Sequence, residues 1–207
     1  IASCLVGSEM CIRDSLNPQD HGPQDACGVI GIYAPGEEVS KLTYFGMYAL
    51  QHRGQESAGM AVSDGRHMMV FKDMGLVSQV FDEATLNSLQ GHMAVGHTRY
   101  STTGASIWDN AQPTFRSRQG GDGLALAHNG NLTNTGALEA LIAERAPDTE
   151  VPHKDRMDSS NDTSLVTALM TTYDGTLEEV AAQVLPHLQG AFSLCLLYTS
   201  DAADDTP

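Results

Sequence analysis

The sequence predicts an α+β domain in which helices pack against β-sheets. Elements of one kind cluster along the chain, in the order strand, helix, several strands, two or three helices and a strand, whereas a doubly wound parallel sheet would alternate them. Hydrophobic residues make up 41% of the 207 residues, which is typical of a soluble globular domain with its own core. Neither an internal repeat nor an obvious interdomain linker divides the sequence.

The first half of the chain contains one helix between strands. The apolar, β-branched stretch GVIGIY, residues 28–33, predicts a buried strand. Residues 38–51 carry apolar side chains at helical spacing and lead into the polar loop QHRGQES. Residues 58–64 and 66–72 predict a hairpin around an Asp-Gly dipeptide that suits a tight primed turn.

The second half adds two strands, three helices and a last strand. Strands are predicted at residues 92–98, 123–129 and 190–197, and helices at 136–146 and 163–173. A third helix begins at Thr176, because the spacing from Thr176 to Glu179 matches a capping box, and Pro186 ends or kinks it.

Charge and cysteine content exclude several classes of function. A net charge of −15 disfavours nucleic-acid binding, because such a surface repels the phosphate backbone. No run approaches the roughly 18 apolar residues that a membrane-spanning helix needs, and no secretory signal is recognisable. Cysteines at positions 4, 11, 27 and 195 form neither a CxxC pair nor a compact framework, so neither structural zinc nor disulfides are predicted and a cytoplasmic location is favoured.

The two ends of the chain differ from the middle. Residues 1–15 show no helix or strand period, and residues 195–207 begin like a strand and continue as a small, acidic tail. Both resemble translated adapter or vector sequence, so we interpret 1–15 as a foreign leader and 195–207 as a foreign tail. The alternative is a natural disordered leader and tail.

Polar clusters follow three of the apolar segments, and they could supply the groups that a Cys27 nucleophile needs. They are QHRGQ at 51–55, HTRYST at 97–102 and HNGN at 128–131, and each alone is typical of turn chemistry. A cysteine nucleophile needs a base, an oxyanion hole and a group that holds the substrate. Candidate bases are the histidines His52, His92, His97 and His128, or the α-amine of Cys27 itself if the chain is cut before it.

The other parts of such a site are also available. Asn129 and Gly130 can donate a side-chain and a backbone N–H to an oxyanion. Arg99 suits a substrate carboxylate, because its planar guanidinium pairs with one through two hydrogen bonds.

Four motifs, CGVIGIY, LQHRGQESAGMAV, GHTRYSTTG and AHNGNLTN, occur in this order between about Asp25 and Phe192. In this the chain resembles the class II glutaminase domains of the glutamine phosphoribosylpyrophosphate amidotransferases. QHRGQ is the most discriminating segment, because the related glucosamine-6-phosphate synthases typically carry a YRGYDSAG-like segment there. The resemblance implies an N-terminal-nucleophile (Ntn) hydrolase fold, a four-layer αββα sandwich of two antiparallel sheets with helices outside, truncated at its C-terminal end.

The resemblance also implies a role for each candidate residue. It assigns Cys27 as the nucleophile, released by removal of a propeptide at 16–26, within a glutaminase domain spanning 27–194. The remaining roles are the glutamine α-carboxylate site (Arg99, with Thr102 beside it), the oxyanion hole (Asn129 and Gly130), the α-amine site (Asp162) and a loop arginine ordered near the nucleophile (Arg53). Many relatives read Ser-Asp-Ser-Glu where this chain reads Asn-Asp-Thr-Ser from position 161.

Structural alternatives exist for several of these residues. Asp162 could simply cap the following helix, and Arg53 could be a solvated loop charge. His97 and His128 are interpreted as hydrogen-bonded strand-end residues rather than catalytic ones.

The function that the resemblance implies is release of ammonia from L-glutamine through a Cys27 thioester. The complete enzyme would transfer this ammonia to phosphoribosylpyrophosphate in a C-terminal phosphoribosyltransferase domain, which this chain lacks, giving phosphoribosylamine for purine synthesis. No cofactor is expected in this fragment; Mg²⁺, and in some members an iron–sulfur cluster, are implied for the complete enzyme, as is a homo-oligomer. The alternatives are the glutaminase domain of a glucosamine-6-phosphate or asparagine synthetase, and a non-catalytic Ntn-like binding domain that never matures.

Overall fold

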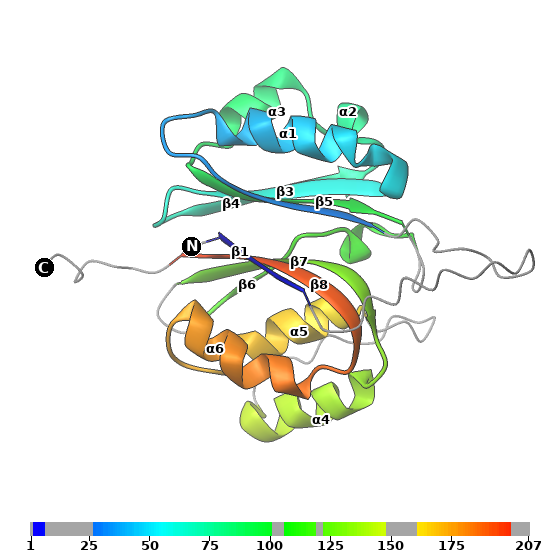
Figure 1. The fold of residues 1–207 in the computed structure, drawn as a ribbon, viewed down its shortest axis with the longest axis vertical. Helices are drawn as coiled ribbons and strands as arrows, with labels where there is room; N and C mark the ends of the chain where they lie inside the picture. The colour runs from blue at the N-terminus through cyan, green and yellow to red at the C-terminus, as the bar shows by residue number, and fades with distance from the viewer. Residues whose placement is uncertain (1, 7–26, 101–105, 119–121, 148–160, 200–207) are drawn as a thin grey trace, which may run out of the picture.

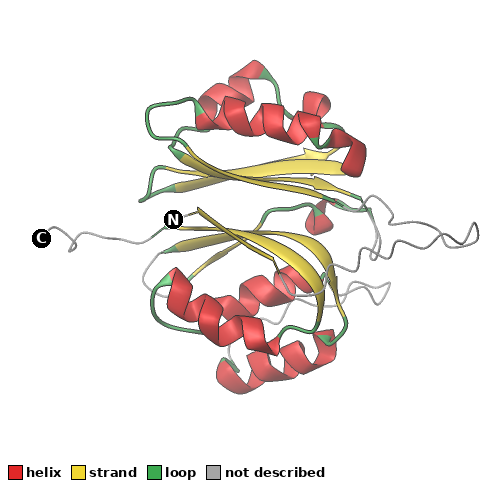
Figure 2. Ribbon diagram, in the orientation of Figure 1, coloured by secondary structure: helices red, strands yellow, loops and turns green. Residues whose placement is uncertain are grey.

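The computed structural model describes residues 2–6, 27–100, 106–118, 122–147 and 161–199. Two antiparallel four-stranded sheets are stacked face to face, and helices cover their outer faces (Figure 1; Figure 2). This confirms the predicted α+β sandwich with its αββα order of layers.

The first sheet has the strand order β2-β5-β3-β4. Its strands are β2 (Gly28–Tyr33), β5 (Met93–Arg99), β3 (Ser57–Ser63) and β4 (Met68–Met74). Helices α1 (Val39–Ala49), α2 (Val77–Val80) and α3 (Glu83–Ser88) cover its outer face, at the top of Figure 1. A short 3₁₀ turn, η1 (Gln51–Arg53), follows α1 directly.

The second sheet has the strand order β1-β8-β7-β6. Its strands are β1 (Ala2–Val6), β8 (Gly190–Tyr198), β7 (Gly123–Leu132) and β6 (Thr114–Ser117). Helices α4 (Thr135–Arg145), α5 (Asp162–Met170) and α6 (Leu177–Val184) cover it from below in Figure 1. Two further 3₁₀ turns are η2 (Trp108–Asn110) and η3 (Leu185–His187).

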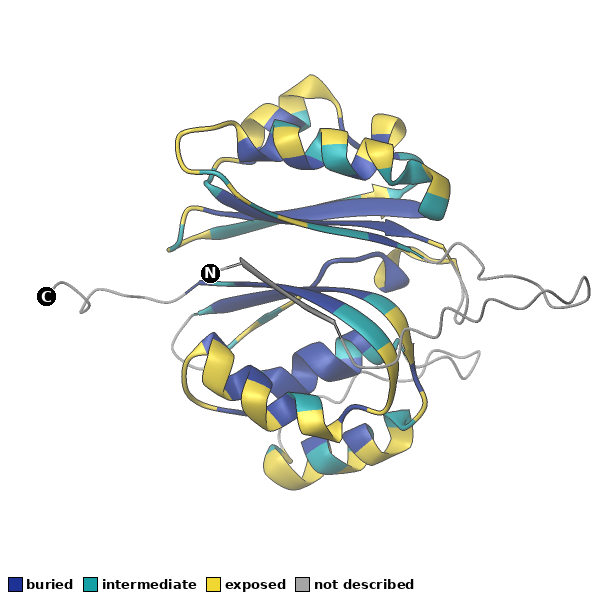
Figure 3. Cartoon of the chain, in the orientation of Figure 1, coloured by how far each residue is buried: buried dark blue, intermediate teal, exposed yellow. Residues whose placement is uncertain are grey.

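The side-chain alternation of the strands divides the apolar residues into three layers. On β7, Leu124 and Leu126 face the helices, while Ala125 and Ala127 face the other sheet. The layer between the sheets contains mainly small or unbranched side chains, namely Ala61, Met93, Val95, Ala125, Ala127, Cys195 and Leu197. Buried residues accordingly gather on the strands and on the inward faces of the helices (Figure 3). Small residues between the sheets let them approach closely and bring their strand ends together.

The long predicted elements are confirmed within two or three residues. The capping box at Thr176 starts α6 as predicted, and α6 ends at Val184, just before Pro186. The hairpin differs from the prediction, because its loop spans four residues, 64–67, rather than a two-residue turn. Asp64 Oδ1 accepts hydrogen bonds from the backbone N–H groups of Arg66 and His67, at 2.9 and 2.7 Å, and this widens the turn.

The chain ends contribute strands to the second sheet. β1 pairs with β8 in antiparallel register, with Cys4 opposite Cys195, and β8 continues to Tyr198. Cys195 is disulfide-bonded, so the prediction of no disulfides is wrong; it rested on the spacing of the cysteines along the sequence, which does not determine which of them the fold brings together. Most of the predicted leader, propeptide and tail (1, 7–26 and 200–207) lies outside the described residues.

Within the described ranges, no helix has the length and apolar character needed to cross a membrane.

Candidate active site

Cys27 lies immediately before β2, where its thiol meets the end of β5. The pairing of Gly28 with Thr98 places Cys27 beside Arg99 and Tyr100. The Cys27 Sγ donates to the Tyr100 carbonyl at 3.5 Å and accepts from the Tyr100 N–H at 3.4 Å. Burial raises the pKa of the Cys27 thiol, while the Tyr100 hydrogen bond and the Arg99 charge partly oppose this. In the uncut chain the thiol is therefore protonated near neutral pH.

The QHRG segment packs against this same strand end. Arg53, in η1, donates from Nε to the Cys27 carbonyl at 3.1 Å. Gln51 holds the segment, because its Oε1 accepts from the Val77 N–H at 2.6 Å and its Nε2 donates to the Gly54 carbonyl. A Cβ on Gly54 would lie 2.5 Å from the carbonyl carbon and oxygen of Thr98. Glycine at this position therefore permits the close approach that brings Arg53 to Cys27.

Arg99, the last residue of β5, is 7% exposed and forms an ion pair with Glu56. Arg99 Nη1 lies 3.1 Å from Glu56 Oε2, and the Glu56 N–H donates to the Arg99 carbonyl at 3.1 Å. Glu56 thus orients the guanidinium, and its role was not predicted from the sequence. A guanidinium carries five N–H donors, so it can bind two carboxylates at once.

Asn129 and Gly130 lie on β7, in the other sheet. His97 Nε2 contacts the His128 carbonyl at 3.1 Å, and this bond joins β5 to β7 just before the Asn129-Gly130 pair. Gly130 has a φ of 146°, and a Cβ there would lie 2.1 Å from the Ala191 carbonyl oxygen. Only glycine fits this position, which leaves its backbone exposed at the strand end.

The histidines do not supply a base to the thiol in the described structure. Burial lowers the pKa of His97 to about 3, so its ring is neutral and its Nε2 is the donor to the His128 carbonyl. His52 contacts the Ala49 carbonyl, and His92 packs edge-on against Tyr33. A papain-like Cys–His pair is therefore not formed, and the α-amine of a released Cys27 is the remaining base of the two considered.

Asp162 begins α5 and points toward β7. Its Oδ2 accepts from the Leu132 N–H at 3.1 Å, and its Oδ1 lies 3.5 Å from His128 Nδ1. Burial acts to raise the pKa of Asp162, but contacts with His128 and with the N–H groups of Leu132 and Thr163 hold it below its ordinary value. The helix-capping residue is Asn161, whose Oδ1 accepts from the Thr163 N–H at 3.1 Å.

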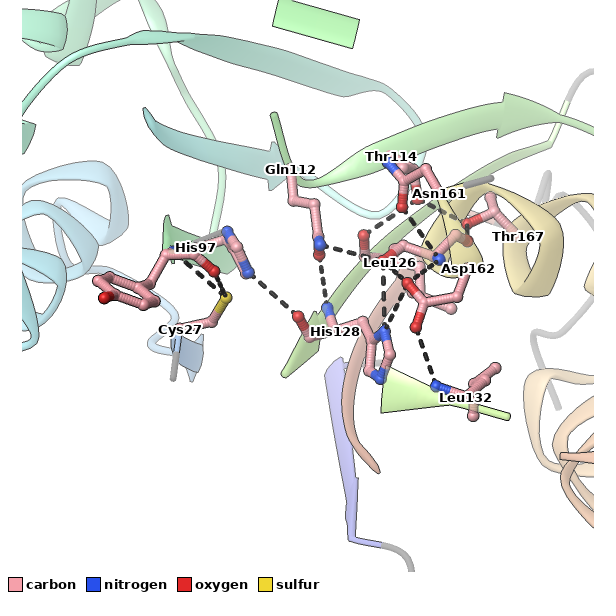
Figure 4. A network of polar contacts seen from close by, with 12 residues as sticks. Cys27, His97, Gln112, Thr114, Leu126, His128, Leu132, Asn161, Asp162 and Thr167 are labelled. Carbon is pink, nitrogen blue, oxygen red and sulfur yellow. Dashed lines mark hydrogen bonds and ion pairs between the residues drawn. The ribbon is translucent and has the colours of Figure 1, made fainter. Parts of the chain in front are cut away.

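The structure thus places the predicted residues in two groups. Cys27, Arg53 and Arg99 form the first group, at the start of β2 and the end of β5. Asn129, Gly130 and Asp162 form the second, on β7 and α5. The His97–His128 contact lies between them, with Cys27 on one side and Asp162 on the other (Figure 4). Thr102 lies outside the described residues.

No group of three or more His, Cys, Asp or Glu side chains among the described residues could hold a metal ion. The Mg²⁺ and the iron–sulfur cluster that the resemblance implies for a complete enzyme stay predictions. The chemistry of the site is that of a thiol, hydrogen-bond donors and two charged groups suited to an amino acid.

Comparison with known proteins identifies clear relatives. The chain is 50% identical over 201 residues to the amidophosphoribosyltransferase of Mycobacterium bovis, a match that covers 93% of this chain and 36% of the relative. It is 63% identical over 123 residues to the amidophosphoribosyltransferase of Synechocystis sp., covering 59% of this chain and 25% of the relative. The chain thus spans about a third of the length of the curated relatives it matches. No family model matches it.

Two of the solved structures that share the fold are 34% identical to this chain. One is the glutamine phosphoribosylpyrophosphate amidotransferase from B. subtilis complexed with ADP and GMP, with a TM-score of 0.68 and 34% identity, covering 82% of this chain and 34% of that one. The other, the allosteric regulatory enzyme of purine biosynthesis, has a TM-score of 0.71 and 34% identity, covering 82% of this chain and 35% of that one. Both matches extend over both sheets.

Proposed function

We propose that this chain, a homologue of the amidophosphoribosyltransferases over most of its length, is the glutamine-hydrolysing part of such an enzyme. The observation that carries the proposal is the position of the Cys27 thiol. The thiol is fixed to the end of β5 beside Arg99, and Arg53 donates a hydrogen bond to the carbonyl of Cys27. A nucleophile, a carboxylate-binding group and a loop arginine thereby meet at one strand end.

The first step of the proposed mechanism requires a free N-terminus at Cys27. While Ala26 is attached, the nitrogen of Cys27 is an amide that cannot accept a proton, and burial keeps the thiol protonated. After the cut, an α-amine with a pKa of about 7.7–8.0 becomes available beside the thiol. The amine takes the thiol proton, and the thiolate attacks the side-chain amide carbon of glutamine.

The remaining steps release ammonia and then glutamate. Asn129 and Gly130 donate N–H groups to the oxyanion of the tetrahedral intermediate. When the intermediate collapses, the C–N bond breaks, the ammonium group of Cys27 returns its proton to the leaving nitrogen, and a γ-glutamyl thioester remains. Water hydrolyses the thioester through a second oxyanion, which regenerates the thiol. Arg99 binds the substrate α-carboxylate and Asp162 its α-ammonium group, because each carries the opposite charge.

The destination of the ammonia belongs to the same proposal. The relatives are almost three times as long as the matched segment, so a phosphoribosyltransferase part would follow and combine ammonia with phosphoribosylpyrophosphate. Mg²⁺, any iron–sulfur cluster and homo-oligomer contacts would belong to that larger protein. A cytoplasmic location accompanies the proposal, because a reducing compartment preserves a thiol nucleophile. No observation favours the glucosamine-6-phosphate or asparagine synthetase alternatives, or a non-catalytic domain.

The experiment compares two asparagines on the same strand end. The chain carrying a protease site before Cys27 is cut, and glutamate formation from glutamine is measured. Asn129→Ala should lower kcat by about 10²–10³, the usual effect of losing an oxyanion donor. Asn131→Ala, at an exposed position two residues further along β7, is the matched control and should leave kcat within about twofold. Equal activity of Asn129→Ala and the control would contradict the assignment.

A further inference from the structure

Gln112 lies where strand β7 stops pairing with the backbone of β6 and is bound by a side chain instead. β6 pairs with β7 as far as Thr114 opposite Leu126. Two residues further along β7, the His128 N–H is bound by the side chain of Gln112, whose Oε1 accepts it at 2.7 Å. The Gln112 side chain thus continues the ladder beyond the first residue of β6. Gln112 is only 6% exposed.

The same side chain reaches α5. Gln112 Nε2 donates to Thr163 Oγ1 at 3.0 Å, so one buried amide connects β7 with the start of the helix (Figure 4). The backbone of Gln112 is fixed as well, because a Cβ on Gly59 of β3 would lie 2.2 Å from the Gln112 carbonyl oxygen. Gln112 therefore contacts both sheets and α5.

The bond to His128 acts immediately before the proposed oxyanion hole. His128 Nδ1 lies 3.3 Å from Thr163 Oγ1, which is the hydroxyl that Gln112 binds. On its other side the imidazole packs beneath Gly130, since a Cβ on Gly130 would lie 2.9 Å from His128 Nε2. That Nε2 is buried and has no hydrogen-bond partner among the residues that the structure describes. The His128 ring is thus held by a contact at Nδ1, and its Nε2 side packs against Gly130.

We propose that Gln112 is a positioning residue for the oxyanion hole: its side-chain amide fixes the His128 backbone and the Thr163 hydroxyl, and thereby the Asn129-Gly130 pair. The inference rests on the proposed glutaminase function. Oxyanion donors act only when they are held within a few tenths of an ångström of the developing charge. Strand β8 pairs with this strand end along one edge, whereas the pairing with β6 along the other edge stops at Leu126. On that second edge, the Gln112 side chain supplies the hydrogen-bond partner of the His128 N–H.

The expected kinetic effect is specific to the chemical step. The hydrogen bonds that Asp162 accepts from the Leu132 and Thr163 N–H groups do not involve the Gln112 side chain. The site proposed for the substrate ammonium group should therefore remain when Gln112 is changed. The oxyanion hole matters most in the transition state. Loss of the Gln112 bonds should therefore lower kcat and leave KM for glutamine nearly unchanged.

The test pairs Gln112→Met with Thr114→Val in the cut full chain. Methionine matches glutamine in shape but makes neither hydrogen bond. Thr114 is also buried between β7 and α5, bonding the Leu126 carbonyl at 3.2 Å and Thr167 Oγ1 at 2.6 Å, but it does not contact His128. Gln112→Met should lower kcat by about ten- to a hundredfold, less than removal of a donor, with KM within about twofold. Thr114→Val should leave both within about twofold.

A second measurement does not depend on activity. Amide hydrogen exchange of residues 128–132 should become at least about tenfold faster in Gln112→Met and stay unchanged in Thr114→Val. Thr163→Val keeps the Gln112–His128 bond but removes the hydroxyl that both Gln112 Nε2 and His128 Nδ1 contact. It should change both readouts in the same sense, and it serves if Gln112→Met fails to fold.

The outcomes separate this inference from the proposed function. A kcat equal to that of Thr114→Val, a raised KM with unchanged kcat, or unchanged exchange would overturn the role of Gln112. If the unsubstituted cut chain does not hydrolyse glutamine, the proposed function fails, and the exchange measurement still decides whether Gln112 holds the strand end.

Discussion

At the scale of single residues, the Cys27 thiol is surrounded by backbone groups rather than by an ionised partner. Its hydrogen bonds run to the N–H and carbonyl of Tyr100. Arg99 lowers and Glu56 raises the thiol pKa, because the two side chains carry opposite charges. The thiol therefore needs another group as its base. The α-amine of the same residue, which a cut before Cys27 would release, is such a group.

His97 should make the folded state sensitive to acid. Its folded pKa of about 3 lies below the ordinary value of 6.5, so the unfolded chain binds a proton at a pH where the folded chain does not. The stability from neutral His97 is present above about pH 6.5 and is lost as the pH falls toward about 3. The free energy of unfolding should fall by up to about 1.4 kcal/mol per pH unit in this window. Urea denaturation at a series of pH values measures this fall.

His97→Gln is the matched variant for this measurement. A glutamine side chain can still donate to the His128 carbonyl, but it does not titrate. The loss of stability between about pH 6.5 and about pH 4 should therefore be smaller in His97→Gln. Parallel curves for the two proteins would show that His97 is not the group responsible.

Gly54 should resist substitution for a purely steric reason. Its φ of −159° is accessible to any residue, so the only penalty is the approach of a Cβ to 2.5 Å from the Thr98 backbone. Gly54→Ala should lower the free energy of unfolding by about 1–3 kcal/mol. Gly136→Ala is the control, because nothing lies within 4 Å of the added Cβ in helix α4, and it should be neutral or stabilising. Equal effects in denaturant unfolding would contradict the packing argument.

At the scale of elements, the start of α6 is set by a local sequence signal, the capping box of Thr176 and Glu179. The Glu179 N–H donates to Thr176 Oγ1 at 3.3 Å, and the Thr176 N–H donates to Glu179 Oε2 at 2.9 Å. Thr176→Ala should lower the free energy of unfolding by about 1 kcal/mol. Glu178→Ala, in the same exposed turn, should cost only a few tenths of a kcal/mol. Thermal or denaturant unfolding compares the two, and an equal cost would argue against the capping box.

Elements with a long periodic pattern could be predicted from the sequence, and short ones could not. Strands β2 and β5 and helices α1 and α6 follow from apolar periodicity and caps. By contrast, α2, α3 and β6 span only four to six residues and form because tertiary contacts hold them. β1 was missed because residues 1–15 showed no strand period, although β8 pairs with it.

The candidate site divides in the same way. The resemblance supplied Cys27, Arg99 and Asn129, which lie within ordered motifs. Glu56 lies within a motif too, but its partner could not be predicted, and neither could the partners of Gln112. Glu56 pairs with a residue 43 positions away, and Gln112 bonds one 51 positions away. Such partners become visible only when the strands are paired.

At the scale of the whole molecule, the proposed site depends on the stacking of the two sheets. The first sheet carries the thiol and the second carries the proposed oxyanion donors, and His97 and His128 connect the two sheets. Alanines at 61, 125 and 127 in the layer between the sheets keep them close. On the right side of Figure 1, the beginning of β2 and the end of β5 lie at the same edge of the sandwich. The two groups of proposed site residues are thus connected through the stacking of the sheets.

The central claim is that Cys27 becomes a nucleophile only as the first residue of its chain. The most direct measurement treats the intact chain and the chain cut before Cys27 with a diazoketone analogue of glutamine, and follows labelling by peptide mass spectrometry. The account predicts one label on Cys27 of the cut chain and none on the intact chain, with Cys195 unlabelled in both. Equally fast labelling of Cys27 in the intact chain, or no labelling after the cut, would contradict it.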